Sequence, residues 1–313
     1  MTMLVTGASG FVGRALTARL VAEGRAIRVA ARRRGEYNAP TVVIGDLAGD
    51  VDWSEAVEGV GTVVHLAGRA HILGREARSD SSSFLRVNVD ATRSLAQASA
   101  AAGVRRLVFL SSAKVMGDES GALPFRESDT PDPVGLYAES KWLAEQAALE
   151  VARTTSLSVV ILRSPLVYGP GVRANFLALL RAVDRGVPMP FGAVANVRSL
   201  IAVDNLVDAL LACAADPSSS SEVYFAKDSE DLSTCALIRI MADALGRKAR
   251  LVPVPPAALR FGARLLGRDD MLARLIGTFS IDATRISERL GWHPRISSAQ
   301  AIGATARWYR GAA

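Results

Sequence analysis

The chain has few of the residues that build disulfide frameworks and metal centres. Only 2 of its 313 residues are cysteine and 3 are histidine. Cys213 and Cys235 lie in helical patterns and do not have the spacing of metal ligands. A disulfide framework is excluded, and we interpret both thiols as core residues. We therefore expect no metal site.

Long hydrophobic runs are also missing. The longest uncharged stretch, residues 1–13, is shorter than the ~20 residues that a membrane-spanning helix needs. No basic residue precedes Arg14, so we expect no secretory signal with a charged start. Half of the residues are hydrophobic and 22% are charged, which is typical of a globular chain. We expect a cytoplasmic protein without membrane insertion.

Positive charge is in modest excess. The 37 basic and 31 acidic residues give a net charge of +6, and the basic residues are scattered except for the cluster at 32–34. A small anionic ligand explains this cluster better than nucleic acid does, so no nucleic-acid partner is expected. Arg260, Arg264 and Arg268 form a stripe at helical spacing. Such a stripe suits a membrane surface or a solvated helix face, and the solvated face is favoured.

Strand-like apolar runs alternate with helical patterns along the first half of the chain. This alternation predicts an α/β fold, a Rossmann-type doubly wound parallel sheet of about seven strands. It stops after Pro165, where Pro170, Pro188 and Pro190 interrupt it. We expect a cofactor-binding domain over 1–165, with 200–227 returning to it, and a smaller interleaved C-terminal substrate region of 166–199 and 228–313. The expected strands are 3–6, 27–31, 41–44, 62–66, 106–110, 158–162 and 222–225, and the expected helices include 11–23, 88–102, 138–153, 232–246 and 256–267.

A glycine-rich turn follows the first expected strand. Gly7, Gly10 and Gly13 have the spacing GxxGxxG and precede an expected helix. Glycines permit a tight bend and a close approach of backbone to a pyrophosphate, which the N–H groups of the helix N-terminus can bind. An ordinary glycine turn is the alternative, but the preceding strand favours a dinucleotide site.

The end of the second expected strand bears on the choice of cofactor. Proteins that bind NAD usually place an acid there for the ribose 2′-hydroxyl. This chain has Arg32 and Arg33, and guanidinium groups suit a 2′-phosphate. NADP(H) is therefore favoured, NAD(H) stays open, and a solvated basic loop is the alternative explanation.

Tyr137 and Lys141 lie four residues apart in a helical pattern, so they share one helix face. A nearby ammonium lowers the pKa of a phenol and allows it to exchange a proton with a substrate oxygen. The YxxxK pattern is common by chance. Downstream of a dinucleotide turn, however, it indicates an enzyme of the oxidoreductase type.

Several segments carry a family resemblance. They are Thr6–Gly13 (TGxxGFxG), Asp46-Leu47, His65–Gly68 (HxAG), Asn88–Thr92 (NVxGT), Ser111–Val115 (SSxxV), and Asp282 followed by Leu290–Pro294 (LGWxP). In these motifs and their order the chain resembles the extended short-chain dehydrogenase/reductases, the nucleotide-sugar epimerase/dehydratase family, over nearly its whole length.

The resemblance implies roles for individual residues. Tyr137 would be the general acid/base, Lys141 its partner, and Ser112 the hydroxyl that orients the substrate oxygen, with Ser111 the less favoured choice. The implied cofactor-binding residues are Gly7, Gly10, Phe11, Val12, Gly13, Arg32, Arg33, Asp46, Leu47, Leu66, Ala67, Gly68, Asn88, Tyr137, Lys141 and Pro165. The implied substrate-binding residues are Ser112, Lys114, Asn175, Phe191, Arg198 and Arg274; core packing of Phe191 and a structural ion pair of Arg198 are the alternatives.

Departures from the family pattern reduce the number of candidate reactions. Family 4,6-dehydratases have an Asp-Glu pair where this chain has Ala113 and Lys114, so a dehydratase is not expected. The resemblance is strongest to bacterial reductases that use NADPH to reduce UDP-2-acetamido-2,6-dideoxy-4-hexulose for surface polysaccharide such as O-antigen. The product would be UDP-N-acetylquinovosamine or UDP-N-acetylfucosamine.

Two other functions remain open at this stage. One is a UDP-hexose 4-epimerase with tightly bound NAD, and the other is a non-catalytic NADP(H) sensor or scaffold. The expected partner is a UDP-sugar. Relatives commonly form homodimers through the helices expected at 88–102 and 138–153, although their many alanines equally suit a monomer's core.

Overall fold

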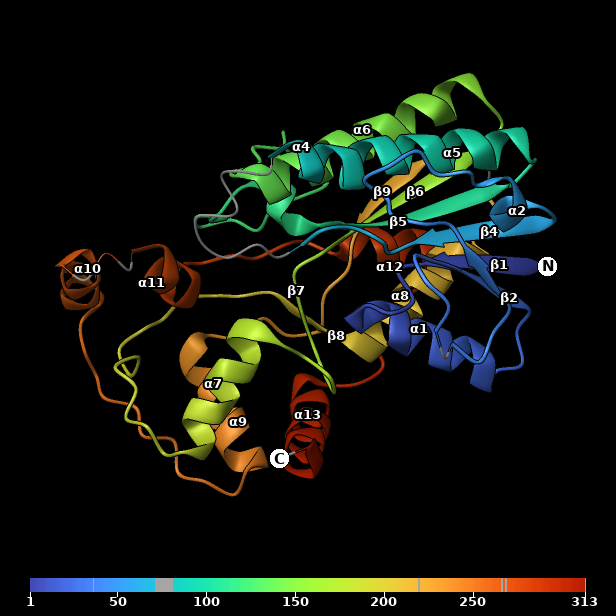
Figure 1. Cartoon of the computed structure of the whole chain (residues 1–313). Coiled ribbons are helices and arrows are strands. Elements are labelled where there is room, and N and C mark those ends of the chain that lie inside the picture. Colours follow the sequence, from blue (N-terminus) through green and yellow to red (C-terminus); the bar gives the residue numbers. More distant parts are fainter. Residues whose placement is uncertain (36, 71–80, 219, 266, 268, 313) are drawn as a thin grey trace.

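The computed structural model describes residues 1–35, 37–70, 81–218, 220–265, 267 and 269–312. Its centre is a seven-stranded parallel sheet with the strand order β3-β2-β1-β4-β5-β6-β9 (Figure 1). The strands are β1 (Thr2–Thr6), β2 (Ile27–Ala31), β3 (Thr41–Val43), β4 (Val60–His65), β5 (Arg106–Ser112), β6 (Ser158–Ser164) and β9 (Glu222–Phe225). This architecture confirms the predicted Rossmann-type doubly wound fold, and each of the seven predicted strands lies in the sheet.

The strands β5 and β6 are both two residues longer than predicted at their C-terminal ends. The sequence prediction ended each strand at its last apolar residue, Leu110 or Leu162. Pairing continues beyond them, because Ser112 is in register with Ser164. Polar residues at these positions therefore lie on the sheet edge where ligands bind in α/β folds.

Helices cover both faces of the sheet (Figure 1). One face carries α1 (Phe11–Ala22), α8 (Val203–Ala215) and α12 (Thr284–Leu290), which contribute to one hydrophobic cluster. The other carries α2 (Ser54–Val57), α5 (Ala91–Ala101) and α6 (Leu136–Thr154), which contribute to a second cluster. The segment before α5 consists of α4 (Ser81–Phe84) and the π-helical η1 (Leu85–Asp90), so the helix predicted over 88–102 begins earlier and changes its winding.

Apart from α8 and α12, the chain between β6 and β9 and after β9 builds a second group of elements. The short strands β7 (Leu166–Tyr168) and β8 (Leu200–Ala202) pair in parallel. Neither was predicted, because three residues give no readable periodicity. The helices here are α7 (Ala174–Asp184), α9 (Thr234–Ala244), α10 (Pro256–Leu265), α11 (Asp269–Ile276) and α13 (Ser298–Ala312), and the 3-10 helix η2 (Ala113–Met116) follows β5. The apolar faces of α7, α9 and α13 share a third hydrophobic cluster.

The two groups of elements are joined by backbone and side-chain bonds. Residues 279–281 run beside both 125 and 198, forming bridges with each. Asn205 of α8 donates to the Asp228 carboxylate at 2.7 Å and to the Ile296 carbonyl at 2.9 Å. The carboxylate of Asp228 also accepts the Tyr168 hydroxyl at 2.7 Å. Asn205 and Asp228 thus connect the main sheet with the C-terminal segment.

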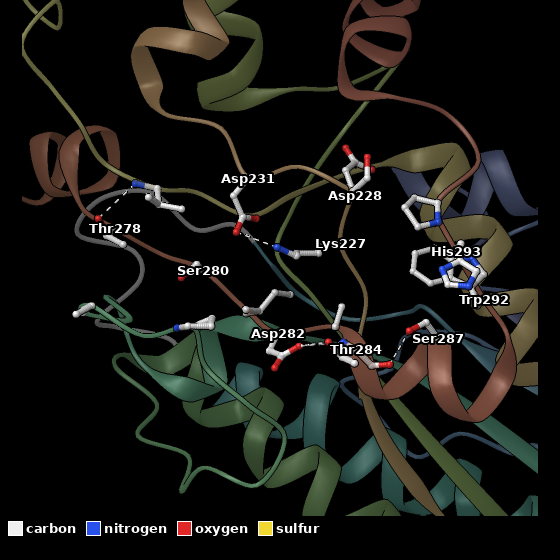
Figure 2. Close-up of a pocket in the computed structure, with 18 residues that line it drawn as sticks. Lys227, Asp228, Asp231, Thr278, Ser280, Asp282, Thr284, Ser287, Trp292 and His293 are labelled. Carbon is white, nitrogen blue, oxygen red and sulfur yellow. Dashed lines mark hydrogen bonds and ion pairs between the residues drawn. The ribbon is translucent and has the colours of Figure 1, made fainter.

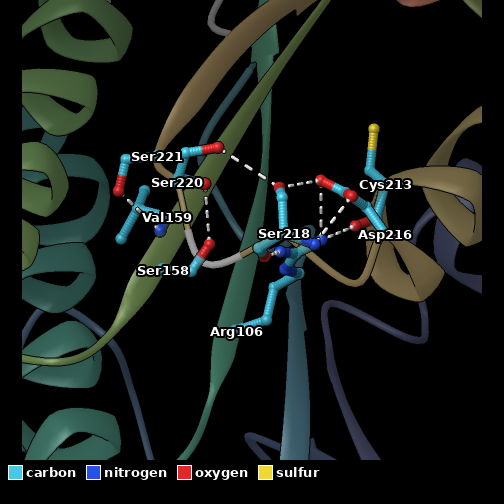
Figure 3. Close-up of polar contacts among 8 residues, drawn as sticks. All are labelled: Arg106, Ser158, Val159, Cys213, Asp216, Ser218, Ser220 and Ser221. Atoms are coloured by element: carbon cyan, nitrogen blue, oxygen red, sulfur yellow. Dashed lines mark hydrogen bonds and ion pairs between the residues drawn. The ribbon is translucent and has the colours of Figure 1, made fainter. Parts of the chain in front are cut away.

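A buried arginine binds the chain at the N-terminal ends of the strands, opposite to the ends at which ligands bind in α/β folds (Figure 3). Arg106, the first residue of β5, donates to the Cys213 carbonyl at 2.9 Å and lies 3.2 Å from a carboxylate oxygen of Asp216. Ser158, the first residue of β6, donates to the Ser220 carbonyl at 3.0 Å. These bonds hold the α8–β9 connection against the strand starts. Both cysteines are free and buried, as predicted.

Among the described helices, none is long and apolar enough to span a membrane.

Candidate active site

The turn between β1 and α1 is packed backbone against backbone. Gly7 has φ +72°, and a Cβ atom there would lie 2.6 Å from the Ala67 nitrogen. A Cβ atom at Gly13 would lie 2.1 Å from the Gly7 carbonyl oxygen. Only glycine fits at these two positions, and the Gly10 N–H closes the turn by donating to the Gly7 carbonyl at 2.9 Å. The N-terminus of α1 is therefore presented at the strand ends, the arrangement that binds a dinucleotide pyrophosphate.

A buried histidine connects this turn to the neighbouring strand and helix. The Thr6 hydroxyl lies 2.7 Å from Nδ1 of His65, and Nε2 of the same ring lies 3.0 Å from the Thr92 hydroxyl. The Thr92 hydroxyl donates its only hydrogen to the Asn88 carbonyl at 2.6 Å. It must therefore accept from Nε2–H, so Nδ1 accepts from Thr6. Burial, and secondarily the charge of Lys141, lower the pKa of His65 to about 3, so the ring is neutral.

The Asn88 side chain extends this network to α6, the helix that carries Tyr137 and Lys141. Its oxygen accepts the Arg69 N–H at 2.7 Å, and its nitrogen donates to the Arg69 carbonyl at 3.1 Å and to the Ser140 hydroxyl at 2.9 Å. The Ser140 hydroxyl in turn donates to the Tyr137 carbonyl at 2.8 Å. Asn88, predicted to bind cofactor, is thus bonded to protein and fixes the segment 66–69 relative to α6.

The segment 66–69 lies beside the glycine turn. The Leu66 and Ala67 N–H groups both donate to the Thr6 hydroxyl at 3.2 Å, and Gly68 is exposed. At the start of α1, Phe11 and Val12 are half-buried. These residues line the edge at which the predicted cofactor site lies.

The predicted adenine end of the cofactor site, after β2, contains both basic and acidic side chains. Arg32 and Arg33 are exposed directly after β2. Arg32 Nη1 lies 3.7 Å from an Asp46 carboxylate oxygen, and both side chains are largely exposed. Leu47 is half-buried against the second hydrophobic cluster. Arg32 and Asp46 are thus close enough to contact one bound group.

Lys141 lies inside the protein at the end of β5. Its ammonium donates to the Leu110 carbonyl at 2.7 Å and lies 4.0 Å from the centroid of the Phe109 ring. Burial lowers the pKa of Lys141 to about 7, and the nearby Glu145 carboxylate acts in the opposite direction. The hydrogen bond and the ring contact of the ammonium are thus both with β5.

The pKa of Tyr137 is shifted upward, whereas the YxxxK pattern predicted a downward shift. Burial raises the pKa of the phenol, and a hydrogen bond with Ser112 acts against that rise. The Ser112 hydroxyl also accepts the Lys114 N–H at 3.2 Å. The phenol is therefore protonated at neutral pH, and burial is the main cause of its pKa shift.

A buried ion pair, missed by the sequence prediction, lies beneath these residues. Nη2 of Arg163 donates to the Glu145 carboxylate at 2.7 Å, and Nε donates to both carboxylate oxygens at 3.1 and 3.2 Å. Ser111 donates to the same carboxylate at 2.5 Å. The hydroxyl of Ser111 is therefore engaged in the interior. The available signals were an acid four residues after Lys141 in an alanine-rich helix and a single arginine in an apolar strand.

Two further predicted residues lie just beyond the ends of β5 and β6. Pro165 is buried directly after β6. Lys114 is half-buried in η2, forms an ion pair with Asp118, and has its ammonium 5.3 Å from the centroid of the Phe279 ring. A positive charge thus lies within two residues of Ser112.

The remaining predicted substrate residues occupy different environments. Asn175 and Arg274 are exposed, on α7 and α11. Arg198 is half-buried and donates to the Gly277 carbonyl at 3.0 Å. Phe191 is 8% exposed and belongs to the third hydrophobic cluster, which corresponds to the packing alternative. Among the described contacts, none joins any two of these four side chains.

A cavity of the described structure lies away from these residues (Figure 2). It has a volume of about 700 Å³ and contains the ion pair of Lys227 and Asp231, whose charged atoms are 2.8 Å apart. None of the predicted catalytic, cofactor-binding or substrate-binding residues lines it. The described part of the chain contains no cluster of three or more side chains suited to hold a metal ion.

Comparison with known proteins establishes the family. The profile of the NAD dependent epimerase/dehydratase family matches residues 3–225, so the chain belongs to this family, as its motifs predicted. UDP-glucose 4-epimerase of Vibrio cholerae is 35% identical over 299 residues, 94% of this chain and 90% of that protein.

Two further relatives show the range of the family. The N-acetyl-alpha-D-glucosaminyl-diphospho-ditrans,octacis-undecaprenol 4-epimerase of Escherichia coli O157:H7 is 28% identical, covering 91% of this chain and 84% of that protein. Among solved structures, MoeE5 in complex with UDP-glucose and NAD has a TM-score of 0.80 and 27% identity, covering 100% of this chain and 99% of that chain.

Proposed function

We propose that the protein uses NADPH to reduce the C4 keto group of a UDP-linked 2-acetamido-2,6-dideoxy-4-hexulose. The carrying observation is the placement of three side chains: Ser112 ends β5, Tyr137 lies in the first turn of α6, and Lys141 of α6 donates to the Leu110 carbonyl of β5 at 2.7 Å. Burial also raises the pKa of the Tyr137 phenol. A reduction consumes a proton at the carbonyl oxygen, so it needs an acid that is protonated at neutral pH. Tyr137 has that property in this chain. The product, UDP-QuiNAc or UDP-FucNAc, would serve surface-polysaccharide synthesis.

In this proposal each catalytic side chain has one task. The nicotinamide cofactor, when bound, supplies the hydride that forms the new C4–H bond. Tyr137 transfers its phenolic proton to the C4 oxygen, and Ser112 donates a hydrogen bond to that oxygen as negative charge develops. Lys141, whose pKa is about 7, offers positive charge on the same helix face when it is protonated.

The proposed preference for NADPH rests on Arg32 and Arg33. Both are exposed directly after β2, where a carboxylate would select the 2′-hydroxyl of NAD. Their guanidinium groups can bind a 2′-phosphate in pairs. We assign the adenine end of the site to these arginines and Asp46, and the pyrophosphate to Gly7, Gly10 and the N-terminus of α1.

The substrate contacts are also proposed. Lys114 lies beside the reacting groups, whereas Arg198 and Arg274 would bind the diphosphate of the UDP-sugar. Asn175 would contact the nucleotide. Phe191, because it is buried in the third cluster, would act mainly by shaping the wall of this region.

A UDP-hexose 4-epimerase is the second candidate. Its support is the 35% identity to the UDP-glucose 4-epimerase of Vibrio cholerae. An epimerase retains its NAD and returns the hydride to the other face of the sugar, so it does not consume the cofactor. Tyr137 would then both accept and return a proton.

The reaction is tested by mixing the purified protein with NADPH and enzymatically prepared UDP-2-acetamido-2,6-dideoxy-4-hexulose. Stoichiometric loss of NADPH absorbance and a 6-deoxy-HexNAc nucleotide in the NMR spectrum are expected. Tyr137→Phe should lower turnover at least ~100-fold, because proton transfer by a positioned acid contributes about that much, and should leave cofactor affinity unchanged.

Tyr309→Phe is the matched control, because this phenol lies far along the chain on α13 and bonds only to Asp184 among the described contacts, at 3.3 Å. Turnover by Tyr137→Phe at the wild-type rate would overturn the assignment of the acid. Tightly bound NAD released on denaturation, with interconversion of UDP-hexoses and no NADPH loss, would establish the epimerase instead.

The cofactor preference is tested separately with Arg32→Ser and Arg33→Ser. Loss of charge–phosphate contacts should weaken NADPH binding ~10-fold or more while NADH binding changes little. The adjacent, exposed Arg34→Ser is the control. Equal weakening for both cofactors would contradict a 2′-phosphate site.

We also propose that the protein is a homodimer through α5 and α6. Leu143 is 45% exposed on α6, and Arg93 of α5 lies 3.0 Å from Glu150 of α6, so the two helices form one continuous surface. Leu143→Arg should yield a monomer in sedimentation velocity experiments. A wild-type protein that sediments as a monomer would overturn this proposal.

A further inference from the structure

The helix α10 exposes two large apolar side chains. Phe261 is 67% exposed and Leu265 is 73% exposed. Because they are four residues apart, they lie on one face of the helix. Ala263, on the opposite side, is buried. The helix thus uses one side to pack against the protein and leaves its bulkiest apolar groups in solvent.

Positive charge lies along one edge of this exposed face. Arg260 and Arg264 are also four residues apart, and both are exposed. They line a cavity of about 140 Å³ whose other lining residues include Glu119 and Ile276. We call Phe261 and Leu265, together with Arg260 and Arg264, the α10 face. It combines apolar bulk with adjacent guanidinium groups.

The position of α10 makes this face accessible. The helix lies at the outer edge of the molecule, away from the main sheet and on the side towards which the parallel strands run (Figure 1). Single exposed apolar residues are common in soluble proteins. Here an aromatic and an aliphatic side chain, one turn apart, accompany two arginines on the outermost helix.

Two features of the α10 face point to one kind of partner. Aromatic and aliphatic side chains enter the boundary between headgroups and acyl chains, while arginines reach the phosphates of anionic lipids. Each basic residue near an anionic membrane surface adds attraction that decays within a Debye length. A nucleotide or other small anion would use the arginines and leave Phe261 and Leu265 without a role.

We propose that the α10 face docks this protein on the surface of an anionic phospholipid membrane. The helix would lie in the interface without spanning the bilayer. This inference goes beyond the proposed reaction and does not depend on it, since neither Phe261 nor Leu265 belongs to the proposed catalytic or binding residues. For Arg260 and Arg264 it favours the membrane alternative over the solvated face expected from the sequence, whereas Arg268, the third arginine of the predicted stripe, lies outside the described residues.

The test is co-sedimentation of the full chain with vesicles at low salt. We expect binding to vesicles of equal parts phosphatidylglycerol and phosphatidylcholine, little binding to pure phosphatidylcholine, and weakening as salt is raised. The double variant Phe261→Ser/Leu265→Ser should partition roughly tenfold less or weaker still. Arg260→Gln/Arg264→Gln should lose most of the salt-dependent part.

Leu123→Ser is the matched control, because Leu123 is 75% exposed but lies in a loop far along the chain from α10. It should bind vesicles as the wild type does. Absence of wild-type binding to anionic vesicles, or equal binding by the Phe261→Ser/Leu265→Ser variant, would overturn the proposal. Loss of self-association in this variant without vesicle binding would instead identify the face as a contact between copies.

Turnover of a soluble nucleotide sugar separates the two proposals. The Phe261→Ser/Leu265→Ser variant should retain wild-type turnover, whatever the reaction proves to be. Failure of the reductase assay would therefore leave the docking test valid, and failure of vesicle binding would leave the reductase assay valid.

Discussion

At the scale of single residues, burial decides the protonation of Tyr137, Lys141 and the nearby His65. Tyr137, Lys141 and His65 all have pKa values shifted towards their neutral forms, and desolvation is the largest cause in each case. The phenol therefore starts as an acid. This favours proton donation to a carbonyl oxygen, the step needed in a reduction.

Lys141 should make the stability of the ligand-free protein depend on pH. Its pKa is about 7 in the folded chain and near ~10.4 when unfolded. Between these values the unfolded chain binds more protons, so stability should rise with pH, by up to about 1.4 kcal/mol per pH unit from this group. Urea unfolding at pH 7 and 9 measures the rise. In Lys141→Met this contribution should vanish; an unchanged slope would contradict the depressed pKa.

The ion pair of Glu145 and Arg163 should be strongly coupled. Both side chains are almost fully buried, so removing one partner leaves an uncompensated charge. Glu145→Gln or Arg163→Met should each destabilise the protein by about 3–5 kcal/mol. The double variant Glu145→Leu/Arg163→Met should lose less than the sum of the singles in urea unfolding. Additive losses would show that the pair does not act as a unit.

At the scale of elements, close backbone contact fixes the cofactor edge. The β1–α1 turn, the 66–69 segment and η1 are held together through Thr6, His65 and Asn88, and Ser140 extends the contact to α6. A change in one element should therefore be transmitted to the helix that carries Tyr137 and Lys141.

Gly13→Ala tests this packing. The added Cβ atom would lie 2.1 Å from the Gly7 carbonyl oxygen, so the turn must move. We expect loss of dinucleotide binding, measured by calorimetry, and destabilisation of about 1–3 kcal/mol, as overpacking usually costs. Gly49→Ala is the control, because its Cβ atom would have an ordinary 3.6 Å contact with the Asp46 carbonyl oxygen. Normal dinucleotide binding by Gly13→Ala would contradict the proposed cradle.

At the scale of the whole molecule, the two groups of elements are interleaved in sequence and bonded through buried polar groups. Asn205 is fully buried, and its amide oxygen accepts the N–H groups of Arg295 and Ile296 at 3.0 and 3.1 Å. Its nitrogen contacts Asp228 and the Ile296 carbonyl. We expect the main sheet and the C-terminal segment to unfold together.

Asn205→Ala should weaken this connection. It leaves the N–H groups of Arg295 and Ile296 without their partner and removes one of the donors to the buried Asp228 carboxylate, so a loss of about 2–4 kcal/mol is expected. Differential scanning calorimetry should show a broader transition, or two transitions, in place of one. Ser229→Ala, at an exposed neighbouring position, should change stability by less than ~0.5 kcal/mol. A sharp wild-type transition in Asn205→Ala would contradict this coupling.

The sequence by itself determined the elements whose signals are local. Strands β2 and β9 have the predicted bounds. The apolar run of β2 ends at the arginines 32–34, and that of β9 begins after the serine-rich sequence 217–221. The glycine spacing identified the β1–α1 turn, since only glycine permits its backbone contacts. The family motifs placed Ser112 and Tyr137 in one site, and the Ser112 side chain is one of the groups that influence the Tyr137 pKa.

The tertiary structure decided what depends on burial and on contacts between distant segments. It showed that Asn88 is bonded within the protein, that Ser111 is engaged by Glu145, and that Lys141 contacts Leu110. Periodicity cannot reveal these pairings, because their partners lie on separate elements. A pKa is likewise set by the solvent that folding removes, so the direction of the Tyr137 shift could only be read from the packed chain.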